Sequence, residues 1–185
     1  MSNMQRRKQF RPFARRVQGG WGLVDVMLGI IAGIFVGAVV YGVYHLVTSD
    51  SRSSAENDAI VQAVGNIQSH CAQANGYGTS GTNLATCLIN LDQVPSGWKK
   101  SGATALTNIY GGSVTITSTG SGFSLSDAGL PNDGCATVAQ GGSSSFNIAT
   151  TTINGSGATV GAVSNAGTAC NAGGNSNTVA FVLPY

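Results

Sequence analysis

The stretch VMLGIIAGIFVGAVVYGVY, residues 26–44, contains no charged side chain and directly follows the segment GGWGLVD, residues 19–25. At a helical rise of about 1.5 Å per residue, about 20 apolar residues are enough to cross a hydrocarbon core roughly 30 Å thick. Asp25 stands at the start of this run, and a carboxylate retained there calls for a partner. The stretch predicts a membrane-spanning helix, and Asp25 favours a processed subunit that polymerises through this helix.

Charge divides the chain at the same junction. Residues 1–20 contain six of the nine basic residues and no acid, whereas residues 21–185 contain three basic residues and all seven acids. By the positive-inside rule, the basic segment stays in the cytoplasm and the C-terminal part is exported. We do not expect nucleic-acid binding, because the basic residues adjoin a membrane segment and the rest of the chain is acidic.

The apolar run differs from the core of an ordinary signal peptide. Such a core has about 7–15 residues and is followed by a cleavage site with small residues. Here the run is longer and no Ala-x-Ala sequence follows it. An uncleaved signal anchor remains the alternative.

Residues 20–25, GWGLVD, followed by an apolar helix, resemble the prepilin junction of type IV pilins. The long basic leader and a first mature residue other than Phe are most similar to the type IVb branch, which includes thin pili of conjugative plasmids. The resemblance implies that a prepilin peptidase cuts between Gly20 and Trp21 on the cytoplasmic face and removes residues 1–20. It also implies an N-terminus of the kind that this family methylates. The family usually has Glu at the fifth mature position, where this chain has Asp25.

Cleavage at this bond would create a charged amino terminus on Trp21, because α-amino groups have a pKa near 8. Asp25 lies one helical turn further along, where negative charge near a helix N-terminus is favourable. In a bundle of parallel helices, Asp25 of one subunit can attract the amine of an incoming one. Two unit charges about 4 Å apart attract by about 4 kcal/mol at an effective dielectric near 20, before desolvation is subtracted. This attraction sets the register, while burial of the apolar helices drives assembly.

Glycines mark one stripe of the apolar helix. Gly29, Gly33 and Gly37 are spaced by four residues, and Gly42 lies outside that register. Small residues at this spacing let helices approach closely in lipid, although glycine is also common in ordinary membrane helices. Each glycine weakens a helix by about 1 kcal/mol relative to alanine. We therefore expect tight helix packing and expect any melting on assembly to lie between Gly37 and Gly42.

Beyond Tyr44 the helix is expected to continue to about Ala74 and to become amphipathic, with Gly76 as a stop signal. Apolar residues follow helical spacing at Ala55, Ala59, Ile60, Ala63, Val64, Ile67, Cys71 and Ala74. Polar residues are expected on the other faces, at Arg52, Glu56, Asp58, Gln62 and Asn66. The predicted helix covers residues 21–74, and residues 21–47 form its apolar half.

Residues 75–185 are rich in Gly, Ser, Thr, Asn and Ala and are expected to form a β-rich head. Four runs predict strands: Ser113–Thr119, Gly122–Leu125, Phe146–Ile153 and Val179–Leu183. An antiparallel sheet packed on the second half of the helix would give an α+β fold. A disordered, low-complexity stalk is the alternative, and the cysteines and recurring apolar runs favour a folded head.

The four cysteines, Cys71, Cys87, Cys135 and Cys170, form an even set without a CxxC motif on the exported side, where disulfides form. Three connectivities are possible, and we favour Cys71–Cys87 with Cys135–Cys170. Closing these loops would contribute roughly 3 and nearly 4 kcal/mol. The second loop resembles the disulfide-bounded variable region of type IV pilins. His70 adjoins Cys71, but the spacing does not fit a zinc site, so no metal is expected.

Other motifs do not indicate an enzyme or a cofactor. The sequence Gly76-x-Gly78-x-x-Gly81 follows a helix rather than a strand, so it is expected to be a loop and not a dinucleotide site. No G-x-S-x-G motif occurs in the chain. The segment Trp98-Lys99-Lys100 could be a contact surface, but a buried tryptophan beside two solvated lysines is the favoured interpretation.

The resemblance to type IV prepilins implies that the chain is a major structural subunit of a thin surface filament used for adhesion or conjugation. Its partners would be identical subunits in a helical homopolymer, the prepilin peptidase and the inner-membrane pilus assembly machinery. The precursor would lie in the inner membrane with its N-terminus inside and its C-terminus outside, before moving into the extracellular filament. Alternatives are a minor pilin or secretion pseudopilin, and an uncleaved, membrane-anchored periplasmic binding module.

Overall fold

Helix α1, Leu23–Asn66, is the first element of this computed structural model, which describes residues 23–159 and 165–184. The expected leader and the Gly20–Trp21 bond lie outside the described residues. A π-helical turn, Ile67–Cys71, follows α1, and Ala72 is then extended. The helical segment thus ends three residues before the predicted end at Ala74. It ends there because Gln73 and Gly76 exchange backbone hydrogen bonds in a turn.

The chain divides into two compact units inside α1, between Gly42 and Val43. The described part of the first unit is helical and displays its apolar side chains. Every large apolar side chain from Val26 to Tyr41 is at least 50% exposed, and those of Phe35 and Tyr41 reach 70%. The second unit contains the rest of α1 and all the strands.

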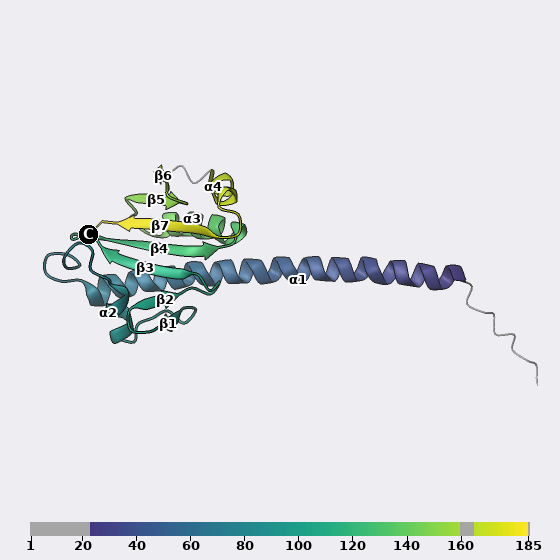
Figure 1. Cartoon of the computed structure of the whole chain (residues 1–185), viewed down its shortest axis with the longest axis horizontal. Helices are drawn as coiled ribbons and strands as arrows, with labels where there is room; N and C mark the ends of the chain where they lie inside the picture. The colour runs from purple at the N-terminus through teal and green to yellow at the C-terminus, as the bar shows by residue number, and fades with distance from the viewer. Residues whose placement is uncertain (1–22, 160–164, 185) are drawn as a thin grey trace, which may run out of the picture. The chain divides into compact units, whose positions relative to one another are not determined.

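The strands of the second unit form one seven-stranded antiparallel sheet in the order β1-β2-β3-β4-β7-β5-β6 (Figure 1). Their bounds are β1 Lys99–Ser101, β2 Ala105–Thr107, β3 Ser113–Ser118, β4 Phe123–Leu130, β5 Thr150–Ile153, β6 Ser156–Thr159 and β7 Asn177–Leu183. The C-terminal strand β7 lies inside the sheet because it pairs with both β4 and β5. Three short helices complete the unit: α2 Ala85–Asn90, α3 Asn132–Ser145 and α4 Ala166–Ala172.

The α+β fold with an antiparallel sheet is confirmed, and the individual strand predictions are confirmed in part. The runs at 113–119, 122–125 and 179–183 contain β3, part of β4 and most of β7. The prediction at Phe146–Ile153 is wrong in its first half, because only Thr150–Ile153 forms a strand. The sequence did not indicate β1, β2, β6 or the three short helices.

One face of the second half of α1 and of the π-helical turn after it joins the core of the head. Six of the eight residues predicted for its apolar stripe are buried, namely Ala59, Ile60, Ala63, Val64, Ile67 and Cys71. The predictions for Ala55 and Ala74 are wrong, because both are exposed. Ala74 lies beyond the helix end, in the turn between Gln73 and Gly76. From the sheet, Phe123, Leu125 and Phe181 fill the same core and are at most 1% exposed.

Helix α3 packs closely on β7 at Gly142. A Cβ atom added there would collide with the buried ring of Phe181. We expect Gly142→Ala to destabilise the head by about 1–3 kcal/mol, because the added methyl overpacks a core that is already filled. Urea denaturation of the full-length, disulfide-bonded chain measures this change.

Gly65→Ala provides the matched control, because Gly65 is also helical and has nothing within 4 Å of an added Cβ. That substitution should stabilise the chain by about 0.5–1 kcal/mol. Equal effects of the two substitutions would contradict the packing of α3 on Phe181.

Candidate functional site

The apolar segment of α1 is the first candidate site. By length and composition, the part of α1 that starts at Val26 could cross a membrane, and its most apolar stretch has no buried residue. Gly29, Gly33, Gly37 and Gly42 are all helical, and the space beside each of their Cα atoms is open. The stripe therefore presents bare backbone on which another helix could pack closely. Asp25 belongs to α1, but its side chain lies outside the described residues.

The two disulfides follow the sequential pairing. Cys71, at the end of the π-helical turn, bonds to Cys87 in α2, with 6.2 Å between their Cα atoms. Cys135 in α3 bonds to Cys170 in α4, with 5.9 Å between their Cα atoms. The first disulfide ties the end of the long helix to the segment that precedes the sheet. The second joins α4 to α3, whose three glycines and three serines give it weak helix propensity.

A buried carboxylate, Glu56, joins α1 to the residues that precede and follow the β1–β2 hairpin. Its side chain is 0% exposed. Oε1 accepts a hydrogen bond from Nε1 of Trp98 at 2.5 Å, and Oε2 accepts one from the backbone N–H of Ile109 at 3.0 Å. The prediction that Glu56 lies on a polar face is therefore wrong. Glu56 precedes the buried Ile60 by four residues, and this spacing places both on one helical face.

Asp127 on β4 is the second buried acid, and it is also 0% exposed. Its Oδ1 accepts a hydrogen bond from Nδ2 of Asn108 at 2.6 Å. Oδ1 of Asn108 in turn accepts hydrogen bonds from the backbone N–H groups of Tyr110 and Gly112, so Asn108 organises the turn between β2 and β3. Glu56 and Asp127 therefore accept hydrogen bonds from two neighbouring residues, Ile109 and Asn108. We call Glu56, Trp98, Asn108 and Asp127 the carboxyl cluster.

Burial controls the acidity of the carboxyl cluster. Desolvation raises the pKa of Glu56, although hydrogen bonds from Ile109, Trp98 and Asp127 oppose that increase. Desolvation also raises the pKa of Asp127 well above its usual range, and the negative charge of Glu56 raises it further. Next to the cluster, Tyr110 Oη lies 3.0 Å from Oγ of Ser53, and burial raises the pKa of Tyr110. The sequence alone did not indicate a special role for Asp127 or Asn108.

Trp98 is buried, 5% exposed, and the favoured interpretation of the segment 98–100 is confirmed. Lys99 and Lys100 are exposed, and Lys100 forms an ion pair with Asp92 on the surface. The charge of Lys100 and its hydrogen bond lower the pKa of Asp92. The lysines are therefore solvated, while the indole belongs to the carboxyl cluster.

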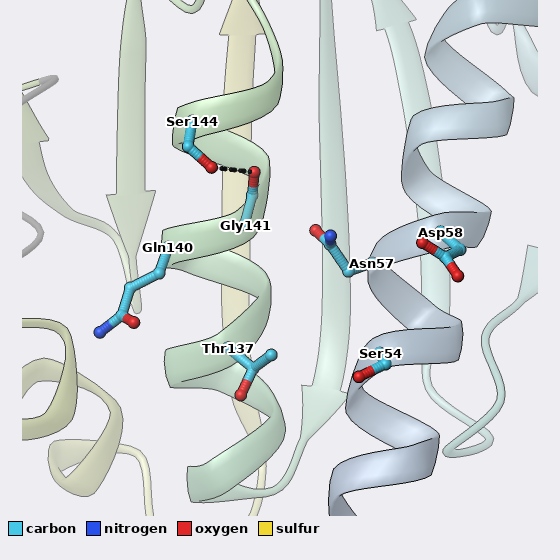
Figure 2. Close-up of a pocket in the computed structure, with 7 residues that line it drawn as sticks. All are labelled: Ser54, Asn57, Asp58, Thr137, Gln140, Gly141 and Ser144. Atoms are coloured by element: carbon cyan, nitrogen blue, oxygen red, sulfur yellow. Dashed lines mark hydrogen bonds between the residues drawn. The ribbon is translucent and has the colours of Figure 1, made fainter.

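An open groove of about 460 Å³ lies between α1 and α3 (Figure 2). Its lining residues are Ser54, Asn57, Asp58, Thr137, Gln140, Gly141 and Ser144. Gly141 allows α3 to approach α1, since a Cβ added to it would collide with the amide of Asn57. The groove is polar, and its lining has a single ionisable group, Asp58, so it lacks the paired acid and base that catalysis would need.

An apolar helical segment, a sheet-covered second half of the same helix and a disulfide-bonded head define the class of type IV pilins. A family model described as "PilS N terminal" matches residues 50–183, and the chain belongs to this family. A solved structure described as the crystal structure of type IVb pilin from Salmonella typhi is similar to the chain with a TM-score of 0.53. The sequences are 21% identical, and the match covers 74% of this chain and 99% of that one. No curated protein matches the chain.

The chain thus belongs to the PilS pilin family and has the fold of a type IVb pilin, and pilins are structural subunits and not enzymes. The family match begins at residue 50, after the apolar run. The match therefore rests on the head and the second half of α1, and it does not include the junction at Gly20 and Trp21.

Trp98→Phe should destabilise the head by about 1–3 kcal/mol, because it leaves an oxygen of buried Glu56 without its donor. Lys100→Met is the comparison variant, because it breaks an exposed ion pair that contributes little. Thermal unfolding of both full-length variants measures the difference. An unfolding temperature for Trp98→Phe equal to that of Lys100→Met would contradict the role of the indole in the cluster.

Proposed function

We propose that the chain is the major subunit of a type IVb-like pilus and polymerises through its apolar helix into a thin surface filament. The observation that carries this proposal is the exposed apolar surface of residues 26–44, attached to a pilin head. A contiguous apolar surface of this size needs lipid or protein to cover it. A membrane covers it before assembly, and the helices of identical subunits cover it in the filament.

The filament itself follows from the symmetry of such a contact. When two different surfaces of identical subunits meet and the arrangement does not close, a helical polymer results. The glycine stripe at Gly29, Gly33 and Gly37 lets the helices approach closely in the filament core. The surface filament then serves cell contact, in adhesion or in conjugation.

Processing precedes assembly in this proposal. The precursor lies in the inner membrane with its basic N-terminus inside, as the positive-inside rule requires. The prepilin peptidase cuts between Gly20 and Trp21, and the assembly machinery of the inner membrane adds the subunit to the growing fibre. Asp25 then pairs with the new amino group of a neighbouring subunit and sets the register.

Asp25→Ala should be processed normally but should fail to enter filaments, because it removes the charge that attracts the new amine. Asp25→Glu is the matched control, since it keeps the charge and should restore filaments. The readouts are the processed fraction in membranes and the amount of subunit in sheared surface material. A normal filament yield from Asp25→Ala would remove the charge-pairing role.

The segment between Gly37 and Gly42 is helical in the monomer and is the place where α1 should melt, if it melts at all, when subunits assemble. Two helix-weakening glycines border this segment, and each costs about 1 kcal/mol relative to alanine. A filament map by electron cryomicroscopy would show the change directly. Full helical density from Gly37 to Gly42, with melting elsewhere in α1, would contradict the expectation.

A further inference from the structure

The carboxyl cluster has a geometry that an ordinary pair of ionised acids cannot satisfy. Glu56 and Asp127 are both 0% exposed, and they accept hydrogen bonds from the neighbouring residues Ile109 and Asn108. Among the described residues, neither acid forms an ion pair with a cation, and Oδ2 of Asp127 has no hydrogen-bond partner. A buried carboxylate needs hydrogen-bond donors or a cation to stay charged, so this geometry favours a proton on one of the two acids.

The hydrogen-bond donors of the cluster identify the acid that carries the proton. Both oxygens of Glu56 receive a donor from the protein, one from Trp98 and one from Ile109. Oδ1 of Asp127 receives a donor from Asn108, whereas Oδ2 is buried and has no donor among the described residues. A proton on Oδ2 would turn that unsatisfied acceptor into a hydrogen-bond donor.

We propose that Glu56 and Asp127 form a proton-binding site, in which Asp127 holds the proton on Oδ2 and donates it to ionised Glu56. The bound proton keeps the β1–β2 hairpin packed against α1. It allows the Glu56 carboxylate to remain buried while it binds Trp98, just before β1, and Ile109, just after β2. Loss of the proton leaves two adjacent, buried negative charges, and relief of their repulsion requires the hairpin to open.

The groups around the site do not neutralise that second charge. Tyr110 is hydrogen-bonded to Ser53 next to the cluster. The negative charges of Glu56 and Asp127 raise the pKa of Tyr110, because they disfavour its ionised form. Arg52 on α1 is the cation that acts on Tyr110, but it is exposed and is not among the groups that shift the pKa of either acid. Within the described residues, the proton is thus the positive charge that the pair uses.

The direction of the pH dependence follows from the raised pKa of Asp127. In the unfolded chain an aspartate loses its proton near about pH 4. Above that pH the folded chain retains a proton that the unfolded chain has lost, so the free energy of unfolding falls as the pH rises. The decrease continues until the folded pair releases its proton. The proton is therefore bound in acid, and the stability that it provides is lost as the pH rises through the raised pKa of the folded pair.

Asp127→Asn tests the proposal, because an asparagine amide supplies the donor permanently and its oxygen still accepts from Asn108. Compared with the parent chain, its unfolding temperature should differ little near about pH 4 and should become higher as the pH rises toward about 9. For Asp50→Asn, an exposed substitution on α1, the difference in unfolding temperature from the parent chain should not grow with pH. All measurements use the full-length, disulfide-bonded chain in detergent micelles.

Glu56→Gln is predicted to behave in the opposite way. Its single amide oxygen cannot serve both Trp98 and Ile109, and its N–H₂ group would face a donor. The unfolding temperature should therefore fall at every pH. If Asp127→Asn lowers the unfolding temperature as much as Glu56→Gln does at every pH, the assignment of the proton to Asp127 is wrong.

Infrared spectroscopy gives a readout that does not depend on the stability of a variant. The parent chain at neutral pH should show the carbonyl band of a protonated carboxylic acid, and Asp127→Asn should lack it. In a Trp21→Phe background, Trp98 is the one remaining tryptophan, and its emission should shift to longer wavelength as alkaline pH opens the hairpin. A parent chain without the acid band at neutral pH would overturn the proposal.

Discussion

The burial of one face of the second half of α1 and of the π-helical turn after it is the interaction on which the head depends. Ile60, Ala63, Val64 and Ile67 are at most 1% exposed, and they share a core with the phenylalanines of β4 and β7. At roughly 25 cal/mol per Å² of buried apolar area, each large side chain in such a core contributes about 1.5–3 kcal/mol. The apolar side chains before Gly42 have no such cover, and assembly is the event that would supply it.

The rest of the head compensates for a sequence that has few large apolar residues. Glycine accounts for 27 of the 185 residues, and helix α3 contains glycines in its interior. Gly142 is nevertheless required there, because α3 packs on Phe181 at a distance that excludes a side chain. The Cys135–Cys170 disulfide holds α3 to α4 and offsets the weak helix propensity of α3. Close packing and disulfides thus replace the large core that this composition cannot provide.

Much of this fold could be predicted from residue spacing. The uncharged run indicated the first half of α1, and alternating residues indicated β3, part of β4 and most of β7. Helix α3 could not be predicted in this way, because its Gly- and Ser-rich sequence is typical of turns. Its helical state depends on contacts with β7 and α4 that are distant in sequence, and local propensity does not report such contacts.

The carboxyl cluster was missed for a different reason. Glu56 was assigned to a polar face by residue type, although its spacing from Ile60 and Ala63 places it on the apolar stripe. That spacing was the available signal, and an acid on such a stripe indicates a buried partner. The partners Trp98 and Asp127 lie 42 and 71 residues further along the chain, so only the tertiary structure brings them together.

The central claim, that this pilin is processed and assembled through its apolar helix, is tested most directly by intact mass. The sample is the chain recovered from material sheared off the cell surface, measured with and without reductant. The account predicts an abundant, sedimentable chain that begins at Trp21 and is lighter by four protons than its reduced form. A full-length chain found only in membranes would contradict it and would favour an anchored module.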